Sequence, residues 1–348
     1  MEKTLLVKGI EGLGNRILCL LTGVLYARLS GRKLIVDWCD ESYSNGAANA
    51  FHQFFVSPWC APTTEVPETD SVVPAIWRGH LKEPAWILRE RYSDLNDAQG
   101  WRTFSIDLGR LDYSEKVAVM WTYNDELGPL MPHLKASGGP LAGASHTSIL
   151  RSLLRETLSL HPRIREKVDR FKRNHFTGRT VGVHIRYTDH RTALWASLDA
   201  LHQILNGDPK CRIFLCTDNI QIKRLFEKKY PQVISTPHWY TSIPGLPLHC
   251  AAARPDPILG GVEALVDLYL LAECNELIVD TSSSFSYLAT LLTQVPPARI
   301  RDVKRRDKLP PRLRGATTRL MRRLHAHSWM PAIIAKLVRG DSVARGRP

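Results

Sequence analysis

The chain has 348 residues, of which 44% are hydrophobic and 23% charged, and this composition is typical of a soluble globular protein with room for two domains. Its longest apolar run near the start, Ile17–Ala27, is about half of the ~20 residues that a membrane span needs. We therefore expect neither a signal peptide nor a transmembrane helix. Seven scattered cysteines form no CxxC or paired His/Cys spacing, which excludes a zinc or redox motif and favours a reducing, cytoplasmic location.

The net charge of +13 is concentrated at one end of the chain. From Arg301 to Pro348 there are 14 Lys and Arg against three Asp, a charge of +11, so the first 300 residues carry only +2. The tail 306–348 also holds apolar residues at a loosely helical spacing, interrupted by Pro331, which is typical of a segment lying on an anionic membrane surface. This predicts peripheral contact with the inner face of the membrane, the alternative being a solvated basic tail. No nucleic-acid partner is expected, because no zinc-finger, RNP or paired aromatic-basic motif accompanies the charge.

The first forty residues predict a strand, a loop, a helix and a second strand, in the order of a βαβ unit. The strands are expected at Leu5–Val7 and Lys33–Trp38, and the helix at Ile17–Leu29. The region 45–175 is less regular and carries five tryptophans, most of which we expect in the core. Helical spacing returns at 149–158 and 163–171, and 172–178 is expected to be a linker.

The loop between the first strand and helix has the composition of an anion site. Gly12 and Gly14 allow a ligand to approach the backbone, and a helix beginning near Asn15 directs its N–H groups towards the same loop. Arg16 adds a full positive charge. The loop lacks a GxGxxG fingerprint, however, and glycine-rich turns of this kind are common in α/β domains.

The second half alternates short strands with longer helices, which predicts a parallel, doubly wound sheet. The expected elements are strand 181–186, helix 194–205, strand 212–216, helix 219–229, strand 232–236, helix 261–273, strand 277–280 and a final helix from Ser284.

Three of these strands end on polar side chains. The first delivers His184, Arg186 and Asp189, and a planar, always charged Arg suits a phosphate or diphosphate. The alternative is that Arg186 pairs with Asp189 or another structural carboxylate. Asp218 follows the second strand and is expected either to bind a ribose hydroxyl or to cap the next helix.

The third strand ends on a run of hydroxyl side chains. Ser282, Ser283 and Ser284 open the last helix and form either a phosphate cradle or an ordinary N-terminal cap. Together the strand ends predict a nucleotide bound between two α/β domains.

Several segments, taken in order, resemble the NodZ family of bacterial nodulation fucosyltransferases, α-1,6-fucosyltransferases that act on chitin oligosaccharides. They are GLGNRILCLLTGVLYARLSGRKLIVDW, NAFHQFF, VGVHIR, FLCTDN, PLHCAA, LYLLAEC and DTSSSFSYLA. The resemblance spans about residues 5–295 and is weak between roughly 60 and 175. The second-half motifs are also similar to those of animal core α-1,6-fucosyltransferases and, more distantly, of α-1,2- and protein O-fucosyltransferases.

The resemblance implies a GT-B architecture, GDP-fucose as donor, inversion at the anomeric carbon, no cofactor and no metal. It assigns diphosphate contact to Arg186 with His184 beside it, and places Gly12, Gly14 and Asn15 opposite the diphosphate. Asp218 falls in the nucleoside motif. Asp267, Ser282 and Ser283 fall in the motif near guanine and diphosphate.

The chain departs from the animal pattern after Arg186. A second Arg, a Lys and a Glu of the animal enzyme are replaced by Tyr187, His190 and Leu194. An inverting transfer needs a base for the acceptor hydroxyl unless the phosphate or a water serves. Asp189 is the first candidate, followed by His190 and Glu263; Asp189 could equally pair with an arginine.

The sequence thus predicts three parts: an N-terminal α/β domain on the acceptor side (1–175), a Rossmann-like GDP-sugar domain (176–305) and the basic tail (306–348). The predicted activity is transfer of fucose from GDP-fucose to a glycan acceptor with N-acetylglucosamine-type ends. The alternatives are a GT-B transferase for another nucleotide sugar and a non-catalytic protein that binds GDP or a glycan.

Overall fold

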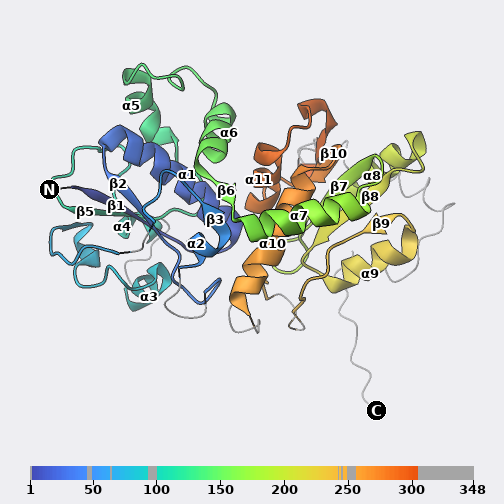
Figure 1. Cartoon of the computed structure of the whole chain (residues 1–348), viewed down its shortest axis with the longest axis horizontal. Helices are drawn as coiled ribbons and strands as arrows, with labels where there is room; N and C mark the ends of the chain where they lie inside the picture. Colours follow the sequence, from blue (N-terminus) through green and yellow to red (C-terminus); the bar gives the residue numbers. More distant parts are fainter. Residues whose placement is uncertain are drawn as a thin grey trace, which may run out of the picture. The chain divides into compact units, whose positions relative to one another are not determined.

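A computed structural model describes residues 2–44, 49–62, 65–92, 100–241, 243, 246–248 and 256–304. Met1–Val303 form one compact unit, within which two parallel sheets are built from successive halves of the chain (Figure 1). The boundary near residue 175 stays a prediction, and the basic tail 306–348 lies outside the described residues. Within the described part, no helix is long and apolar enough to cross a membrane.

The first sheet has the order β2-β1-β5-β4, with every neighbouring pair parallel. It confirms the predicted βαβ unit and adds two strands from the irregular region, β4 and β5. Its strands are β1 (Thr4–Lys8), β2 (Lys33–Asp37), β4 (Val72–Val73) and β5 (Val117–Met120), and a separate antiparallel pair joins β3 (Phe55–Val56) to β6 (Ser159–Leu160). Around them lie α1 (Leu13–Ser30), α2 (Ala50–Phe54), η1 (Ala75–Trp77), α3 (Ala85–Arg91), α4 (Gly100–Thr103), η3 (Gly128–Leu130), α5 (Met131–Ala136), α6 (His146–Thr157) and α7 (Pro162–His175).

The second sheet is parallel throughout, with the order β11-β10-β7-β8-β9, and confirms the predicted alternation. The central strand β7 is fully buried, as a strand covered on both faces must be. The elements are β7 (Thr180–Ile185), α8 (Leu194–Gly207), β8 (Arg212–Thr217), α9 (Ile220–Lys229), β9 (Val233–Ile234), α10 (Pro257–Ala272), β10 (Glu276–Val279), α11 (Ser284–Leu292), η5 (Pro297–Arg299) and β11 (Ile300–Asp302).

One detail of the prediction is wrong: the predicted linker 172–178 is helical in its first part, because α7 continues to His175. Of the five tryptophans in 45–175, Trp77 and Trp121 are fully buried, and Trp59 and Trp86 are 47% and 37% exposed. The side chain of Trp101 lies outside the described part, so the expectation that most of the five are in the core stays a prediction.

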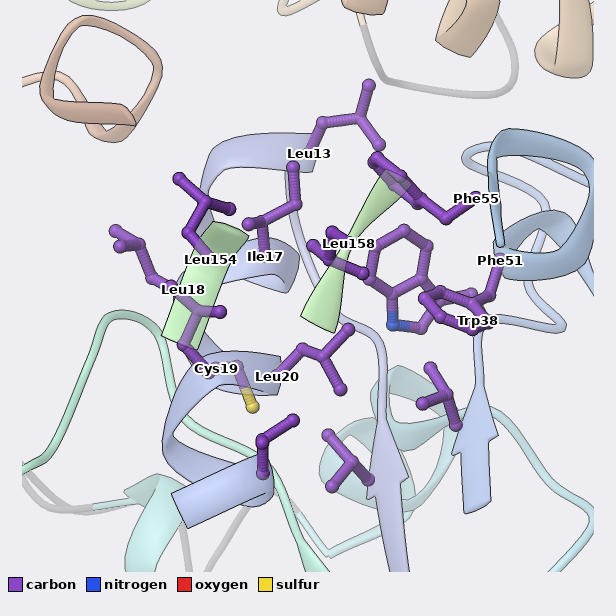
Figure 2. Packing of buried hydrophobic residues seen from close by; sticks show 14 of the residues in the cluster. Leu13, Ile17, Leu18, Cys19, Leu20, Trp38, Phe51, Phe55, Leu154 and Leu158 are labelled. Atoms are coloured by element: carbon purple, nitrogen blue, oxygen red, sulfur yellow. The ribbon is translucent and has the colours of Figure 1, made fainter. Parts of the chain in front are cut away.

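After its first turn helix α1 is almost entirely apolar, and it is buried from Arg16 to Ala27, as such a helix must be inside a domain. It ends at Gly31, whose left-handed φ of 68° suits a glycine. Figure 2 shows side chains of its first turns, among them Leu13, Ile17 and Leu20, packed with Trp38 and with residues that follow β2 and α6. The helix begins earlier than predicted, so Gly14, Asn15 and Arg16 belong to its first turn rather than to a loop.

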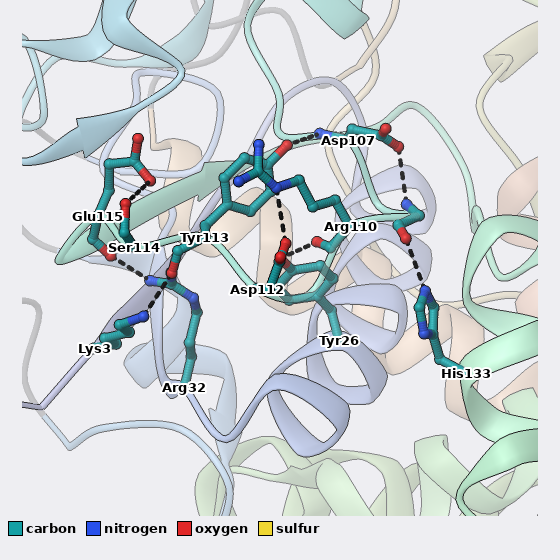
Figure 3. Close-up of polar contacts among 11 residues, drawn as sticks. Lys3, Tyr26, Arg32, Asp107, Arg110, Asp112, Tyr113, Ser114, Glu115 and His133 are labelled. Atoms are coloured by element: carbon teal, nitrogen blue, oxygen red, sulfur yellow. Dashed lines mark hydrogen bonds and ion pairs between the residues drawn. The ribbon is translucent and has the colours of Figure 1, made fainter.

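A polar network fixes the segment that leads into β5 (Figure 3). The buried guanidinium of Arg32 donates to the carbonyls of Thr4, Tyr113 and Glu115 at 3.2, 2.7 and 3.0 Å. The Tyr26 hydroxyl of α1 donates to the Arg110 carbonyl at 2.7 Å. Because these bonds satisfy buried carbonyls, they hold β1, α1 and β5 together as one frame.

The two halves share one hydrophobic cluster. Their helices come into close contact at glycines, which have no side chain. Helix α10 packs on α2 as well as on α7 and α11, and a Cβ at Gly261 would lie 2.1 Å from Phe54 Cζ. Similarly α1 packs on α11, where a Cβ at Gly14 would lie 2.8 Å from the carbonyl carbon of Ser284. Both glycines therefore permit contacts that any larger residue would push apart.

Gly261→Ala should lower the free energy of unfolding by about 1–3 kcal/mol, because the new methyl group overlaps the Phe54 ring in a packed core. Gly207→Ala at the end of α8 is the matched control: nothing lies within 4 Å of its Cβ, and we expect it to be neutral or slightly stabilising. Urea denaturation of both variants measures the difference. Equal stabilities would contradict the tight α10–α2 contact.

Candidate active site

A pocket of about 540 Å³ opens where the loop after β1 meets the carboxyl ends of β7, β8 and β10. Both halves of the unit line it. It brings together almost all the residues that the sequence singled out: Gly12, Gly14, Asn15, His184, Arg186, Asp189, Asp218, Asp267, Ser282, Ser283 and Ser284. Arg16 is the exception and does not line it.

Two helix N-termini meet at this pocket. Helix α1 begins after Gly12 and helix α11 after Ser283, and neither residue caps its helix with a side-chain hydrogen bond. The Ser284 hydroxyl donates to Asn15 Oδ1 at 2.8 Å, which joins the two first turns. Because uncapped N-termini present N–H groups and the positive end of the dipole, this junction is a site for an anion.

Ser283 distinguishes the two interpretations of the hydroxyl run. It occupies the N-cap position of α11, yet its Oγ is buried and has no hydrogen-bond partner among the described residues. The ordinary cap is therefore not formed. A buried hydroxyl without a partner carries a free-energy cost that a ligand oxygen in the pocket would remove.

Arg186 follows β7 directly and forms a two-pronged pair with Asp189. Its Nε and Nη2 donate to the two carboxylate oxygens at 2.8 and 2.5 Å. The alternative from the sequence, an Arg186–Asp189 pair, is thus observed. Burial opposes ionisation of Asp189, but the hydrogen bonds and charge of Arg186 outweigh it and lower the pKa of the carboxyl group. The fork that would hold two phosphate oxygens holds a carboxylate here.

His184 lies behind Arg186 and is buried. Its Nδ1 is 2.6 Å from the Ser286 hydroxyl, and its ring packs on Phe285 at 4.9 Å. Burial, and secondarily the charge of Arg186, lowers the pKa of His184 to about 3. The imidazole is therefore neutral near pH 7 and connects the end of β7 to α11.

Asp218 does not cap the helix that follows it; Asn219 does, by accepting from the N–H groups of Gln221 and Ile222. Asp218 instead accepts from the Tyr187 N–H at 2.6 Å and the Thr188 hydroxyl at 2.5 Å, and so holds the loop after β7. Burial raises the pKa of its carboxyl group despite these bonds. The capping alternative is wrong, and Asp218 faces the pocket.

Asp267 reaches the pocket from α10 and is buried. It accepts from the Thr236 hydroxyl at 2.5 Å and from the Cys216 thiol at 3.6 Å, and burial raises the pKa of its carboxyl group. His238 stands 3.7 Å away and donates through Nε2 to the Thr217 carbonyl at 3.1 Å. This group offers a buried acceptor beside several polar side chains.

Arg16 serves the site indirectly. Its buried guanidinium pairs with Asp40 at 2.5 Å, donates to the Glu11 carbonyl at 2.8 Å and packs near the Trp38 and Tyr43 rings. The prediction that its charge faces a ligand is therefore not supported by its position. It holds the loop before α1.

The pocket also contains residues that no sequence pattern marked. Glu11, Tyr43, Tyr123, Asn124 and His238 line it. His190 and Glu263, already candidate bases, line it too, and the Glu263 carboxylate accepts from the Trp239 N–H at 3.3 Å. Among the described residues, no cluster of His, Cys, Asp and Glu could hold a metal ion. Part of the PLHCAA motif lies outside the described residues.

Known proteins resemble this chain in sequence and in fold. The family model of nodulation protein Z (NodZ) matches residues 146–305. Nodulation protein Z of Azorhizobium caulinodans is 26% identical, covering 81% of this chain and 87% of the relative. That of Bradyrhizobium diazoefficiens is 25% identical, covering 80% and 76%. The expected resemblance to NodZ is confirmed.

Solved structures show the same fold. The fucosyltransferase NodZ from Bradyrhizobium superposes with a TM-score of 0.52 at 23% identity, covering 84% of this chain and 94% of that one. An Arabidopsis thaliana FUT1 mutant in complex with GDP gives 0.54 at 15% identity, covering 85% and 70%. The predicted GT-B-like architecture, with two Rossmann-like halves facing a cleft, is confirmed.

The low pKa of His184 predicts a pH-dependent stability. Between its ordinary value of ~6.5 and about 3, the unfolded chain binds a proton that the folded chain does not. The free energy of unfolding should therefore fall as the pH drops through this window, by up to ~1.4 kcal/mol per pH unit. His184→Gln keeps a polar group near Ser286 but removes the titration. Urea denaturation between pH 7.5 and 4.5 measures both slopes.

His175→Gln, a change at an exposed histidine at the end of α7, is the control and should keep the wild-type slope. An unchanged slope in His184→Gln would mean that His184 titrates normally in the fold.

Proposed function

We propose that this chain is an inverting glycosyltransferase that transfers fucose from GDP-fucose to a glycan acceptor. One observation carries the proposal: a two-pronged arginine and two uncapped helix N-termini converge on one pocket with a buried, unpartnered serine hydroxyl. Such a set of donors matches a diphosphate. The relatives support fucose as the sugar and guanine as the nucleobase of the donor. One NodZ α-1,6-fucosyltransferase structure was soaked with GDP-fucose, and another was co-crystallised with GDP.

The diphosphate takes the place of Asp189 on Arg186. Its oxygens then face the guanidinium, the N-terminus of α11 and the Ser283 hydroxyl. As the bond to the sugar breaks, negative charge grows on the departing GDP, and these fixed donors stabilise it without reorganising. The reaction therefore needs no metal ion, because Arg186 and the helix dipoles supply the positive charge.

The other pocket residues have supporting roles. Neutral His184 keeps Arg186 and α11 in register without adding a competing charge. Asp218 orders the loop after β7 and faces the nucleoside. Asp267 places a buried hydrogen-bond acceptor where an N–H group of the guanine can reach it. Asp189 is a positioning residue for Arg186 while no GDP-fucose is bound.

The acceptor binds on the wall formed by the first half. Tyr43 and Tyr123 there offer aromatic faces to a sugar ring. By similarity to NodZ, the acceptor is a chitooligosaccharide or another N-acetylglucosamine-type glycan, fucosylated through an α-1,6 linkage. A non-catalytic GDP-binding protein is the second candidate, favoured by the Tyr187, His190 and Leu194 departures. It predicts GDP binding without turnover of GDP-fucose.

Arg186→Ala should weaken GDP binding by about tenfold or more while leaving the fold intact. Isothermal titration calorimetry in EDTA, with GMP and UDP as controls, measures the effect. Wild type should bind GDP far better than GMP, because the second phosphate fills the Arg186 fork, and loss of a charge-assisted pair weakens binding by about tenfold or more. Arg110→Ala removes an exposed Asp-paired arginine that does not line the pocket and should bind normally.

GDP binding by Arg186→Ala at wild-type affinity would refute the diphosphate site. GDP binding by wild type without transfer to any glycan would favour the non-catalytic candidate. Preferred turnover of another nucleotide sugar would replace fucose in the proposal.

The basic tail 306–348 contacts anionic lipid from the cytoplasmic side. Its charge of +11 from Arg301 onward, interleaved with leucines, supports this proposal. The full chain should sediment with phosphatidylglycerol vesicles at low salt but not with phosphatidylcholine vesicles, and deletion of 306–348 should abolish it. Vesicle binding that survives the deletion or resists high salt would contradict an electrostatic tail.

A further inference from the structure

We infer that Glu11 is the general base of the transfer, an inference that rests on the proposed function. Glu11 lies in the loop between β1 and α1 and lines the pocket together with Arg186 and Tyr123. It is the one non-glycine residue with positive φ in the described part of the chain, at 60°. This conformation costs a glutamate free energy that glycine would not lose.

The surrounding structure holds Glu11 in that conformation. Arg16 Nε donates to the Glu11 carbonyl at 2.8 Å, and Asp40 and two aromatic rings fix the Arg16 guanidinium in turn. The fully buried guanidinium of Arg16 thus holds the Glu11 carbonyl in place. Strain that is maintained in this way, at the wall of a pocket, is typical of a residue whose side chain must be placed for function.

The side chain lies where an acceptor would enter. It is 42% exposed, and Oε1 is 4.0 Å from Arg89, whose guanidinium lies over the Tyr123 ring at 5.6 Å. Glu11 therefore belongs to the wall formed by the first half, with Tyr43, Tyr123 and Asn124. An inverting transfer needs its base on the acceptor side, away from the groups that hold the leaving diphosphate.

Six other titratable groups of the pocket make hydrogen bonds of their own. Asp189 is paired with Arg186, and His184 is buried and neutral. His190 lies 3.2 Å from the Ser282 hydroxyl at the diphosphate side. Glu263 accepts from the Trp239 N–H, and Asp218 and Asp267 are held by their own donors.

The proposed transfer moves the acceptor proton to Glu11 and the fucose to the acceptor oxygen. The Glu11 carboxylate takes the proton of the acceptor hydroxyl while that oxygen forms a bond to the anomeric carbon. The bond from this carbon to the β-phosphate oxygen breaks, and its electron pair leaves with GDP. Protonated Glu11 then returns the proton to solvent.

Glu11→Gln and Glu11→Gly test the assignment against Glu90→Gln, the same change at an exposed glutamate of α3 that does not line the pocket. We expect kcat for fucosyl transfer to fall by about 100-fold or more in both Glu11 variants, with GDP affinity unchanged. The acidic limb of the kcat–pH profile should disappear. Sodium formate should restore transfer by Glu11→Gly, where space is freed, and not by Glu11→Gln. Glu90→Gln should match wild type.

A Glu11→Gln enzyme within tenfold of wild type, or one that keeps the acidic limb, would overturn the assignment. So would a parallel loss of GDP affinity, which indicates a role in donor binding. Absence of transfer by wild type would instead overturn the proposed function, and this assignment with it.

Discussion

The pocket depends on a close contact between two helix N-termini. Gly14 in the first turn of α1 lies against Ser284 in the first turn of α11, and only a missing side chain permits it. Both ends carry partial positive charge, so bringing them together is unfavourable unless something negative lies between them. The Asn15–Ser284 hydrogen bond holds the junction while the pocket is empty. A ligand with two or more negative charges would relieve the repulsion, and a neutral ligand would not.

The two arginines that the sequence assigned to the ligand, Arg16 and Arg186, are already paired in this structure. Arg16 is neutralised by Asp40 inside the protein, and Arg186 by Asp189 at the pocket wall. The first pair has 0% and 4% side-chain exposure and is permanent architecture, whereas the second has 25% and 26% and can be exchanged. A ligand on Arg186 therefore gains only the difference between its own contacts and those of Asp189. A diphosphate also reaches the α11 N-terminus, so its contacts are more favourable than those of the Asp189 carboxylate. A singly charged group would gain little binding free energy over Asp189.

The sequence predicted most of the second half because its strands are apolar and separated by periodic helices, although the three-residue strand β11 was not expected. Since parallel strands end at one edge, the sequence alone places Arg186, Asp218 and Ser282–Ser284 together. The two-residue strand β4 and the four-residue strand β5 lie in the irregular region, without long periodic helices beside them, and were missed. Arg16 was misplaced because its burial depends on Asp40, which no local pattern connects to it. Glu11 was missed because backbone strain leaves no trace in composition.

The continuous core determines which parts of the site can move. One hydrophobic cluster runs from Leu5 in β1 to Leu291 in α11, so separating the two halves would expose apolar surface at a large free-energy cost. The helix junction and the Glu11 loop are therefore preorganised. Asp189, by contrast, lies in the loop between β7 and α8, which is tied down mainly through Asp218 and Thr192. Exchange of carboxylate for diphosphate thus requires only this loop to adjust, and the fixed donors keep the geometry that stabilises a departing diphosphate.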